Sequence, residues 1–150
     1  MPDLALLTTA GPIATLTLNR VDARNSLSLD LLDALHTRLA ELESQPAITV
    51  LILTGAGKAF CAGMDLKAVA SDEGLAAGLP LKLLSSLADL TLRLRRLPVV
   101  SIAKVNGAAI GGGCGLATVC DIAITHADSK MGFPEVDLGV CPAVVAPWLV

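Results

Sequence analysis

Aromatic residues are nearly absent from this chain of 150 residues, which has two phenylalanines, one tryptophan and no tyrosine. Its core must therefore be aliphatic, in keeping with a hydrophobic content of 53%. The net charge is −3 and the sequence has no basic run. Without basic patches or aromatic stacking residues, nucleic acid is not expected as the main partner.

Long apolar runs are missing as well. The uncharged stretch from Val105 to Cys120 is shorter than the ~20 residues of a bilayer span and is rich in glycine. The chain start carries Asp3 and no basic flank, unlike a signal or transit peptide. The cysteines match no zinc or redox spacing: Cys61, Cys114, Cys120 and Cys141. We expect buried free thiols, no metal, no membrane partner and a cytoplasmic location.

The apolar pattern predicts an α/β chain with a mainly parallel sheet. Two short runs around Gly11-Pro12 are typical of a β-hairpin. The runs "ITVLILTG", "VVSIAKV" and "DIAITHA" are continuous enough to predict strands buried on both faces. Helices are predicted from Ser28, as N-cap, to about Ser44, and over residues 81–97. The segment 68–80 is rich in small and acidic residues, and we expect a mobile loop there.

Glycine-rich turns follow three of the predicted strands: "LTGAGKAFCAGMDL", "KVNGAAIGGGCGL" and "VDLGVCP". Ligands of parallel sheets bind beyond the carboxyl ends of the strands, so these turns predict one shared site. The spacings of a phosphate-binding loop and of a dinucleotide motif are both absent. An oxyanion hole, made of two backbone N–H groups, remains as a functional interpretation. The alternative is that the glycines serve only close packing.

Four blocks together resemble the enoyl-CoA hydratase/isomerase (crotonase) family: "NRVDARNSLS", "LTGAGKAFCAGMDLK", "VNGAAIGGGCGLATVCDIAI" and "MGFPEVDLGVCP". The resemblance implies a crotonase-like ββα superhelix, with residues 1–150 forming its acyl-CoA-binding core. It also implies that the chain covers the N-terminal part of the family domain and lacks the C-terminal helices. In the family those helices complete the wall of the active site and the trimer. The resemblance to the family also implies a homotrimer or a dimer of trimers.

The same resemblance implies three catalytic residues. The N–H groups of Met64 and Gly112 would hold the thioester oxygen as it becomes an enolate, each contributing roughly 3 kcal/mol by analogy with other oxyanion holes. Glu135, in the "PE" block, would be the acid and base.

Coenzyme A is implied only as the carrier of the substrate, and no separate cofactor is expected. The family's contacts with coenzyme A fall on six residues of this sequence: Ala23, Arg24, Ala62, Met64, Leu66 and Lys67. Arg24 and Lys67 could meet its phosphates. Asp65 fits the N-cap of a following helix better than a chemical role.

One position departs from the family pattern. Many hydratases of the family carry a first glutamate two residues after the glycine triplet, and this chain has Gly115 there. A hydratase with Glu135 alone is our preferred interpretation, because hydratases of branched glutaconyl-type esters share this feature and a tail similar to "GVCPAVVAPWLV". A Δ3,Δ2-enoyl-CoA isomerase with a single carboxylate is the first alternative. A non-catalytic acyl-CoA binder and a trimeric scaffold are the others.

Overall fold

The computed structural model describes residues 3–139 and 141–149, without the side chains of Lys67 and Leu138. Its strands are β1 (Ala5–Ala10), β2 (Ile13–Leu18), β3 (Val50–Gly55), β4 (Ala59–Cys61), β5 (Val100–Val105), β6 (Ala108–Ile110), β7 (Ile122–Thr125) and β8 (Met131–Gly132). Its helices are α1 (Leu29–Glu43), α2 (Leu66–Val69), α3 (Asp72–Ala76), α4 (Leu79–Arg96) and α5 (Gly112–Thr118). The short 3-10 turns are η1 (Val21–Ala23), η2 (Pro134–Leu138) and η3 (Ala146–Trp148).

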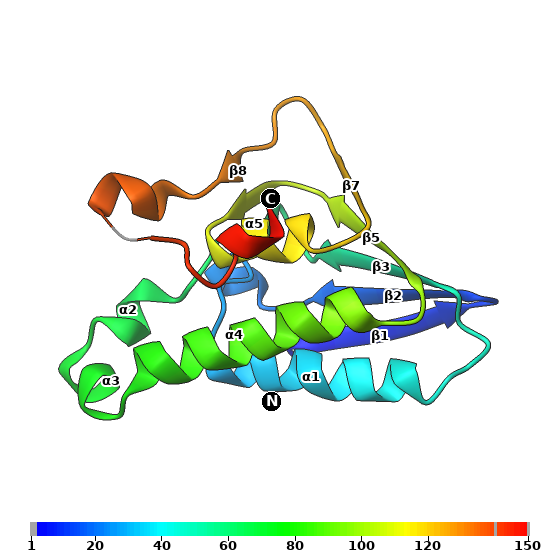
Figure 1. Cartoon of the computed structure of the whole chain (residues 1–150), viewed down its shortest axis with the longest axis horizontal. Helices are drawn as coiled ribbons and strands as arrows, with labels where there is room; N and C mark the ends of the chain where they lie inside the picture. Colours follow the sequence, from blue (N-terminus) through cyan, green and yellow to red (C-terminus); the bar gives the residue numbers. More distant parts are fainter. Residues whose placement is uncertain (1–2, 140, 150) are drawn as a thin grey trace.

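The larger sheet has the strand order β1-β2-β3-β5-β7 (Figure 1). β1 and β2 form the predicted antiparallel hairpin, with Gly11 at a φ of 58° in its turn. Every other neighbouring pair in this sheet is parallel. The prediction of a mainly parallel α/β chain is confirmed.

A second sheet was not predicted. It contains three short parallel strands in the order β4-β6-β8. Each strand has only two or three residues and lies beside a glycine-rich turn, so its hydrophobic pattern is too short to stand out. These three strands carry the candidate site.

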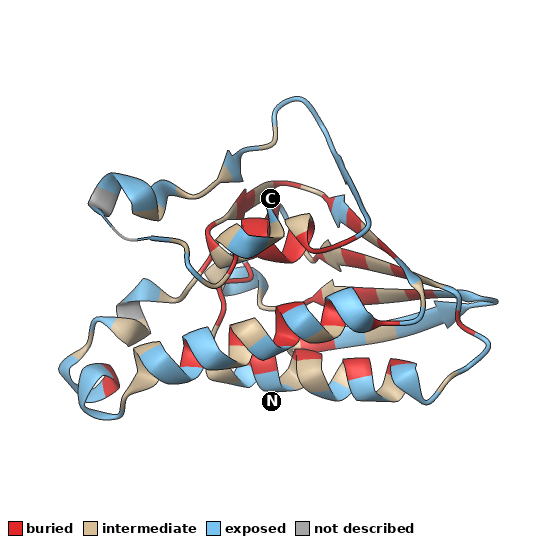
Figure 2. Ribbon diagram, viewed as in Figure 1, coloured by how far each residue is buried: buried red, intermediate tan, exposed pale blue. Residues whose placement is uncertain are grey.

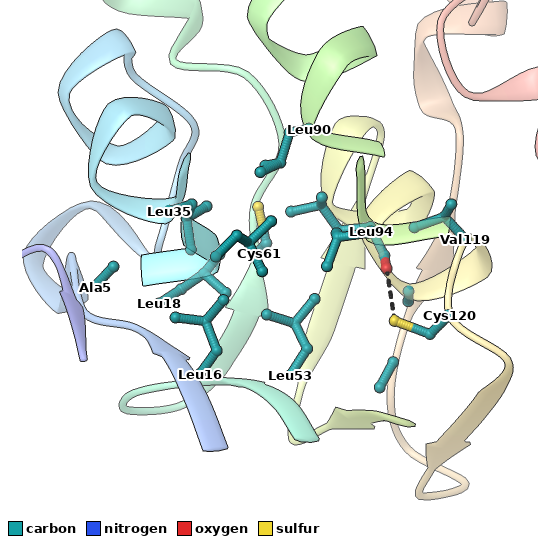
Figure 3. Close-up of a cluster of buried hydrophobic side chains, with 14 of the residues drawn as sticks. Ala5, Leu16, Leu18, Leu35, Leu53, Cys61, Leu90, Leu94, Val119 and Cys120 are labelled. Carbon is teal, nitrogen blue, oxygen red and sulfur yellow. Dashed lines mark hydrogen bonds between the residues drawn. The ribbon is translucent and has the colours of Figure 1, made fainter. Parts of the chain in front are cut away.

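α1 has the predicted bounds, and Ser28 marks its start in the sequence. The Ser28 hydroxyl accepts a hydrogen bond from the Leu31 N–H at 3.3 Å and so caps the first turn. The leucines at helical spacing are buried in the core: Leu31, Leu32, Leu35, Leu39 and Leu42. Figure 3 shows Leu35 of α1 facing the core that also contains Leu16 and Leu18 of β2.

α4 packs against α1 and begins two residues before the predicted start, after Gly78 with a φ of 65°. Leu83, Leu87, Leu90 and Leu94 are buried, so the leucine spacing serves the core of this chain. In the part of the chain that the structure describes, no helix combines the length and the apolarity that a bilayer crossing requires.

The prediction of strands buried on both faces is wrong. Along β3, Leu51 and Leu53 are buried, but the alternating side chains Val50 and Ile52 are only half-buried. β7 is exposed along its whole length (Figure 2). α1 packs on β1 and β2, and α5 packs on β5, so helices cover one face of the sheet and leave the other open.

The expected loop at 68–80 is also wrong in part. Short helices occupy most of it, because polar side chains cap each of them. Asp65 Oδ1 accepts from the Ala68 N–H at 3.4 Å and begins α2, as predicted for Asp65. Ser71 Oγ accepts from the Gly74 N–H at 3.0 Å and begins α3.

The cysteines are all free. Burial raises the pKa of the Cys61 and Cys120 thiols to about 12, and it is the largest cause of a raised pKa at Cys114. Cys141 is exposed, which corrects the expectation that every thiol is buried.

Candidate active site

The three predicted catalytic residues follow the three strands of the small sheet. Met64 comes three residues after β4, Gly112 two residues after β6, and Glu135 three residues after β8. Because these strands are parallel, their carboxyl ends lie at one edge of the sheet. The sheet therefore brings together residues that are far apart in the sequence.

The turn after β4 lies directly against the turn after β6. Gly63 has a φ of 88°, and a Cβ built on it would come within 2.8 Å of the Ile110 carbonyl oxygen. Only glycine combines this backbone conformation with so close an approach. Met64 is thereby held next to the start of α5.

Leu27 also connects the two turns. Its N–H donates to the Gly63 carbonyl at 2.7 Å, and its own carbonyl accepts from the Asp65 N–H at 3.0 Å. These bonds bracket Met64, which pairs with Leu27 as an isolated parallel bridge. A Cβ at Gly112 would lie 2.8 Å from Leu27 Cδ1, so the Leu27 side chain packs on the other candidate donor.

The glycine triplet serves two purposes. Gly111 has a φ of 52° and precedes α5, while its N–H donates to the Gly132 carbonyl at 2.8 Å. A Cβ at Gly113 would collide with the backbone carbonyl and the side chain of Cys61, and one at Gly112 would displace the ends of the Leu27 and Leu87 side chains. Close packing, the alternative interpretation of the glycines, thus accounts for part of the pattern.

Two backbone donors at this edge have no acceptor among the residues that the structure describes. Within residues 3–139 and 141–149, neither the Met64 N–H nor the Gly112 N–H donates to a protein acceptor. Gly112 is the first residue of α5, where helical N–H groups have no partner in the helix. Both groups are therefore candidate donors for the predicted oxyanion hole.

Glu135 lies beside these donors. A Cβ built at Gly111 would be 3.3 Å from Glu135 Oε2 and 3.4 Å from Oε1, so the carboxylate rests against the Gly111 backbone. Glu135 is half-buried in η2, and its charge is one cause of the raised pKa of the nearby Cys114 thiol, after burial. Figure 1 shows η2 at the same end of the molecule as α2 and α3.

The apolar side chain of Val145 fills the space beside Gly115. A Cβ at Gly115 would overlap Val145 Cγ1 and lie 2.6 Å from Val145 Cβ. Val145 is 3% exposed. Gly111 is the N-cap of α5 and Gly115 lies within the helix, so Glu135 lies beside the start of α5 and Val145 packs against its middle. The sequence identified the departure at Gly115 but not the residue that fills the space.

The residues predicted to contact coenzyme A border the same turns. Ala62 and Met64 are half-buried, and Leu66 is 66% exposed at the start of α2. Arg24 is exposed, and its carbonyl accepts from the Ala62 N–H at 3.0 Å. Ala23 is half-buried in η1. The side chain of Lys67 lies outside the described part of the chain.

The sequence missed the polar residues that support these turns. Asn25 is fully buried, accepts from the Arg20 N–H at 2.9 Å, and donates to the Ala56 and Ala59 carbonyls at 2.9 Å. Arg20 pairs with Asp65 at 2.8 Å. Both Arg20 and Asn25 stand in the motif "NRVDARNSLS", but their burial depends on contacts with distant segments.

A hollow of about 420 Å³ lies elsewhere, at the adjoining ends of α1 and α4. It is lined by Glu43, Arg93 and Arg96 among others, and by none of the predicted site residues. Its lining comes from helix ends rather than from the carboxyl ends of parallel strands, so it does not share the geometry of the candidate site.

Known proteins share both the sequence pattern and the fold of this chain. The sequence profile of the enoyl-CoA hydratase/isomerase family matches residues 8–150. The chain belongs to the enoyl-CoA hydratase/isomerase family. It is 38% identical over 138 residues to a short-chain-enoyl-CoA hydratase of Clostridium acetobutylicum, a match that covers 91% of this chain and 52% of the relative.

Solved structures of the family have the same fold. A Legionella pneumophila protein described as an enoyl-CoA hydratase/isomerase (crotonase) superposes with a TM-score of 0.90 at 34% identity, over 100% of this chain and 58% of that one. Human enoyl-coenzyme A hydratase domain-containing protein 3 gives a TM-score of 0.88 at 27% identity, over 97% and 57%. The chain thus has the crotonase fold and spans about half the length of the family members it matches.

Proposed function

We propose that the protein is a hydratase that adds water across the 2,3 double bond of an enoyl-CoA thioester, with Glu135 as its acid and base. The observation that carries the proposal is the grouping of two unused N–H donors and one carboxylate at the edge of the small sheet. The family and the names of its relatives support the same class of substrate.

In the proposed reaction, the Glu135 carboxylate takes a proton from water while the hydroxyl oxygen adds to carbon 3 of the substrate. The double bond shifts, and negative charge develops on the thioester oxygen. In this proposal the Met64 and Gly112 N–H groups stabilise the enolate by donating hydrogen bonds to the thioester oxygen. Glu135 then returns the proton to carbon 2, which completes the addition of one water.

The substitution Glu135→Gln tests the proposal, since it removes the proton acceptor and keeps the shape. With but-2-enoyl-CoA as substrate, we expect kcat to fall by about 10²- to 10⁴-fold, while the dissociation constant of the thioester changes little. Asp137→Asn is the matched control, because Asp137 is an exposed carboxylate in the same turn, η2. Equal turnover by the Glu135→Gln and unmodified chains would contradict the assignment.

A second candidate is a Δ3,Δ2-enoyl-CoA isomerase. The packing of Val145 against Gly115 favours it, because an apolar side chain stands where a second water-holding acid would be needed. Glu135 would then remove a proton from carbon 2 of a 3-enoyl-CoA and return it to carbon 4. Products of 2-enoyl-CoA, 3-enoyl-CoA and 3-methylglutaconyl-CoA, followed by mass spectrometry in D2O, distinguish double-bond migration from hydration.

The remaining proposals concern the whole protein. Contacts with coenzyme A are assigned to Ala23, Arg24, Ala62, Met64, Leu66 and Lys67. We also propose a cytoplasmic homotrimer or dimer of trimers. A chain that binds CoA esters without turnover, and is unaffected by Glu135→Gln, would instead be a non-catalytic acyl-CoA binder.

A further inference from the structure

Two segments of the candidate site run side by side as a short ladder. The Ala62 N–H donates to the Arg24 carbonyl at 3.0 Å, and the Leu27 N–H donates to the Gly63 carbonyl at 2.7 Å. The Asp65 N–H then donates to the Leu27 carbonyl at 3.0 Å. The direction of the unused Met64 N–H therefore depends on how residues 24–27 are held.

Residues 24–26 donate backbone hydrogen bonds to the preceding turn, from the Arg24, Asn25 and Ser26 N–H groups to the carbonyls of residues 20–23. Arg24 and Asn25 have φ values of 52° and 56°, in the left-handed region that non-glycine residues adopt only at a cost. Such a conformation persists only where surrounding contacts fix it. Asn25 supplies contacts on one side, through its hydrogen bonds to Ala56 and Ala59.

Arg20 supplies the contacts on the other side. Its Nη1 lies 2.8 Å from Asp65 Oδ2, 2.9 Å from Ser26 Oγ and 3.1 Å from the Ser26 carbonyl oxygen. The side chains of Arg20 and Asp65 are 27% and 17% exposed, so water screens the pair only in part. The guanidinium thus joins the segment that contains Ser26 to the residue that follows Met64.

Asp65 extends this connection to α2. While one carboxylate oxygen accepts from Arg20, the other accepts from the Ala68 N–H and caps the helix. Leu66, a predicted contact for coenzyme A, is the first residue of α2. The Arg20–Asp65 ion pair therefore connects the residue that follows Met64 with the beginning of the next candidate contact segment.

We propose that Arg20 is a positioning residue for thioester binding and enolate stabilisation. It holds Asp65 beside Ser26 and so keeps the Met64 N–H in line with the Gly112 N–H. The proposal rests on the proposed function, since it assigns Arg20 a role in the same site. Arg20 touches no substrate atom in this scheme, and its effect passes through Asp65.

Two substitutions separate this role from a general loss of packing. Arg20→Met keeps most of the side-chain volume and removes all three hydrogen bonds. Arg20→Lys keeps the charge, and its ammonium can serve the three acceptors because all of them are served by one nitrogen of Arg20. We expect Arg20→Met to lower kcat/KM for but-2-enoyl-CoA by about 10- to 100-fold, and Arg20→Lys to restore most of it.

Arg93→Met is the matched control. Arg93 is 28% exposed and pairs with Glu43 at 2.7 Å, so its burial and bonding resemble those of Arg20. It joins α1 to α4 and lies outside the candidate site. We expect this variant to lose stability while kcat/KM and the dissociation constant of acetyl-CoA stay unchanged.

Hydrogen exchange of the unliganded full chain provides a readout that does not depend on activity. In Arg20→Met, the amides of residues 24–27 and 62–66 should exchange faster than in the unmodified chain and in Arg93→Met. Faster exchange together with unchanged kcat/KM and acetyl-CoA affinity would overturn the positioning role, as would unchanged exchange. If the unmodified chain bound no CoA ester at all, the proposed function would fail, and the exchange data would still show whether Arg20 fixes the ladder.

Discussion

Val145 fills the space that a side chain at position 115 would need. This pair therefore decides which side chains the site can contain. Replacing glycine by alanine inside a helix normally gains about 0.5–1 kcal/mol. At position 115 the added methyl group would overlap Val145, whose backbone is part of the segment that packs on α5. We expect overpacking to outweigh the gain, so that Gly115→Ala lowers the free energy of unfolding by about 1–2 kcal/mol.

Urea denaturation of a double-mutant cycle measures this competition. Val145→Gly removes the atoms that the methyl group added by Gly115→Ala would meet, so the two substitutions together should cost less than the sum of their separate effects, by about 1–3 kcal/mol. Gly139→Ala is not a suitable control for the added methyl group, because Gly139 has a φ of 72° and any side chain there would strain the backbone. Additive effects of the two substitutions would show that Val145 does not occupy the space beside Gly115.

The candidate site was predictable at the residue level where its residues stand in contiguous motifs. Met64 follows Gly63, Gly112 is the middle glycine of the triplet and Glu135 stands in the "PE" pair, so the family resemblance could assign them from the sequence. Arg20 and Val145 gained no role from the sequence, because their contacts with Asp65 and Gly115 join segments separated by tens of residues. Such contacts depend on the fold rather than on local spacing.

At the scale of the secondary-structure elements, the Asp121 carboxylate connects β5 and β7 in addition to the backbone hydrogen bonds between the two strands. Asp121 Oδ2 accepts from the Ser101 N–H and hydroxyl at 2.8 Å each, and Oδ1 accepts from Arg95 at 2.7 Å. The hydrogen bond from the Ser101 N–H is the largest cause of a pKa below the ordinary 3.8 of an aspartate. The ionised form therefore stabilises the folded chain.

Asp121→Asn tests this link between the two strands. Because the folded pKa is depressed, the carboxylate's contribution is present above the unfolded pKa and is lost as the pH falls through the folded value. We expect the variant to be less stable by about 1 kcal/mol at pH 7, with the difference shrinking below about pH 4.

Denaturation curves between pH 3 and pH 7 provide the measurement for the Asp121 prediction. Asp128→Asn is a suitable control, because Asp128 is exposed and has no ion pair among the described residues. A stability difference that stays constant across this pH range would show that charge at position 121 is unimportant.

Helices with a long apolar pattern at helical spacing, or with a clear capping residue, were predictable from the sequence, and short helices were not. α1 has a serine cap and five leucines on one face, and the structure gives it the predicted bounds. The helices α2 and α3 have only four and five residues, too few for a visible period, so the sequence suggested a loop. Continuous apolar runs suggested strands buried on both faces, but a run cannot tell whether helices cover one face or two.

At the scale of the whole molecule, the larger sheet leaves an apolar face open. Four side chains on this face are 39–58% exposed: Ile13, Val100, Ile122 and Ile124. The register places Ile13 in line with Val50 and Val100, and Ile122 in line with Ile102, so the apolar surface continues across the strands. β7 is also an edge strand, with no partner on its outer side in the described part of the chain. Exposed apolar patches and unpaired edges promote association.

We therefore expect this chain to self-associate in sedimentation velocity as its concentration rises, and Ile122→Thr/Ile124→Thr to weaken the association. Threonine keeps the β-branch that suits a strand and removes apolar surface, so the melting temperature should change little. Leu81→Thr is the control, since Leu81 is 72% exposed on α4, away from the sheet. If the double variant and the unmodified chain sedimented alike, association would have to come from another surface. The open sheet face would then be excluded as a contact in the proposed trimer or dimer of trimers.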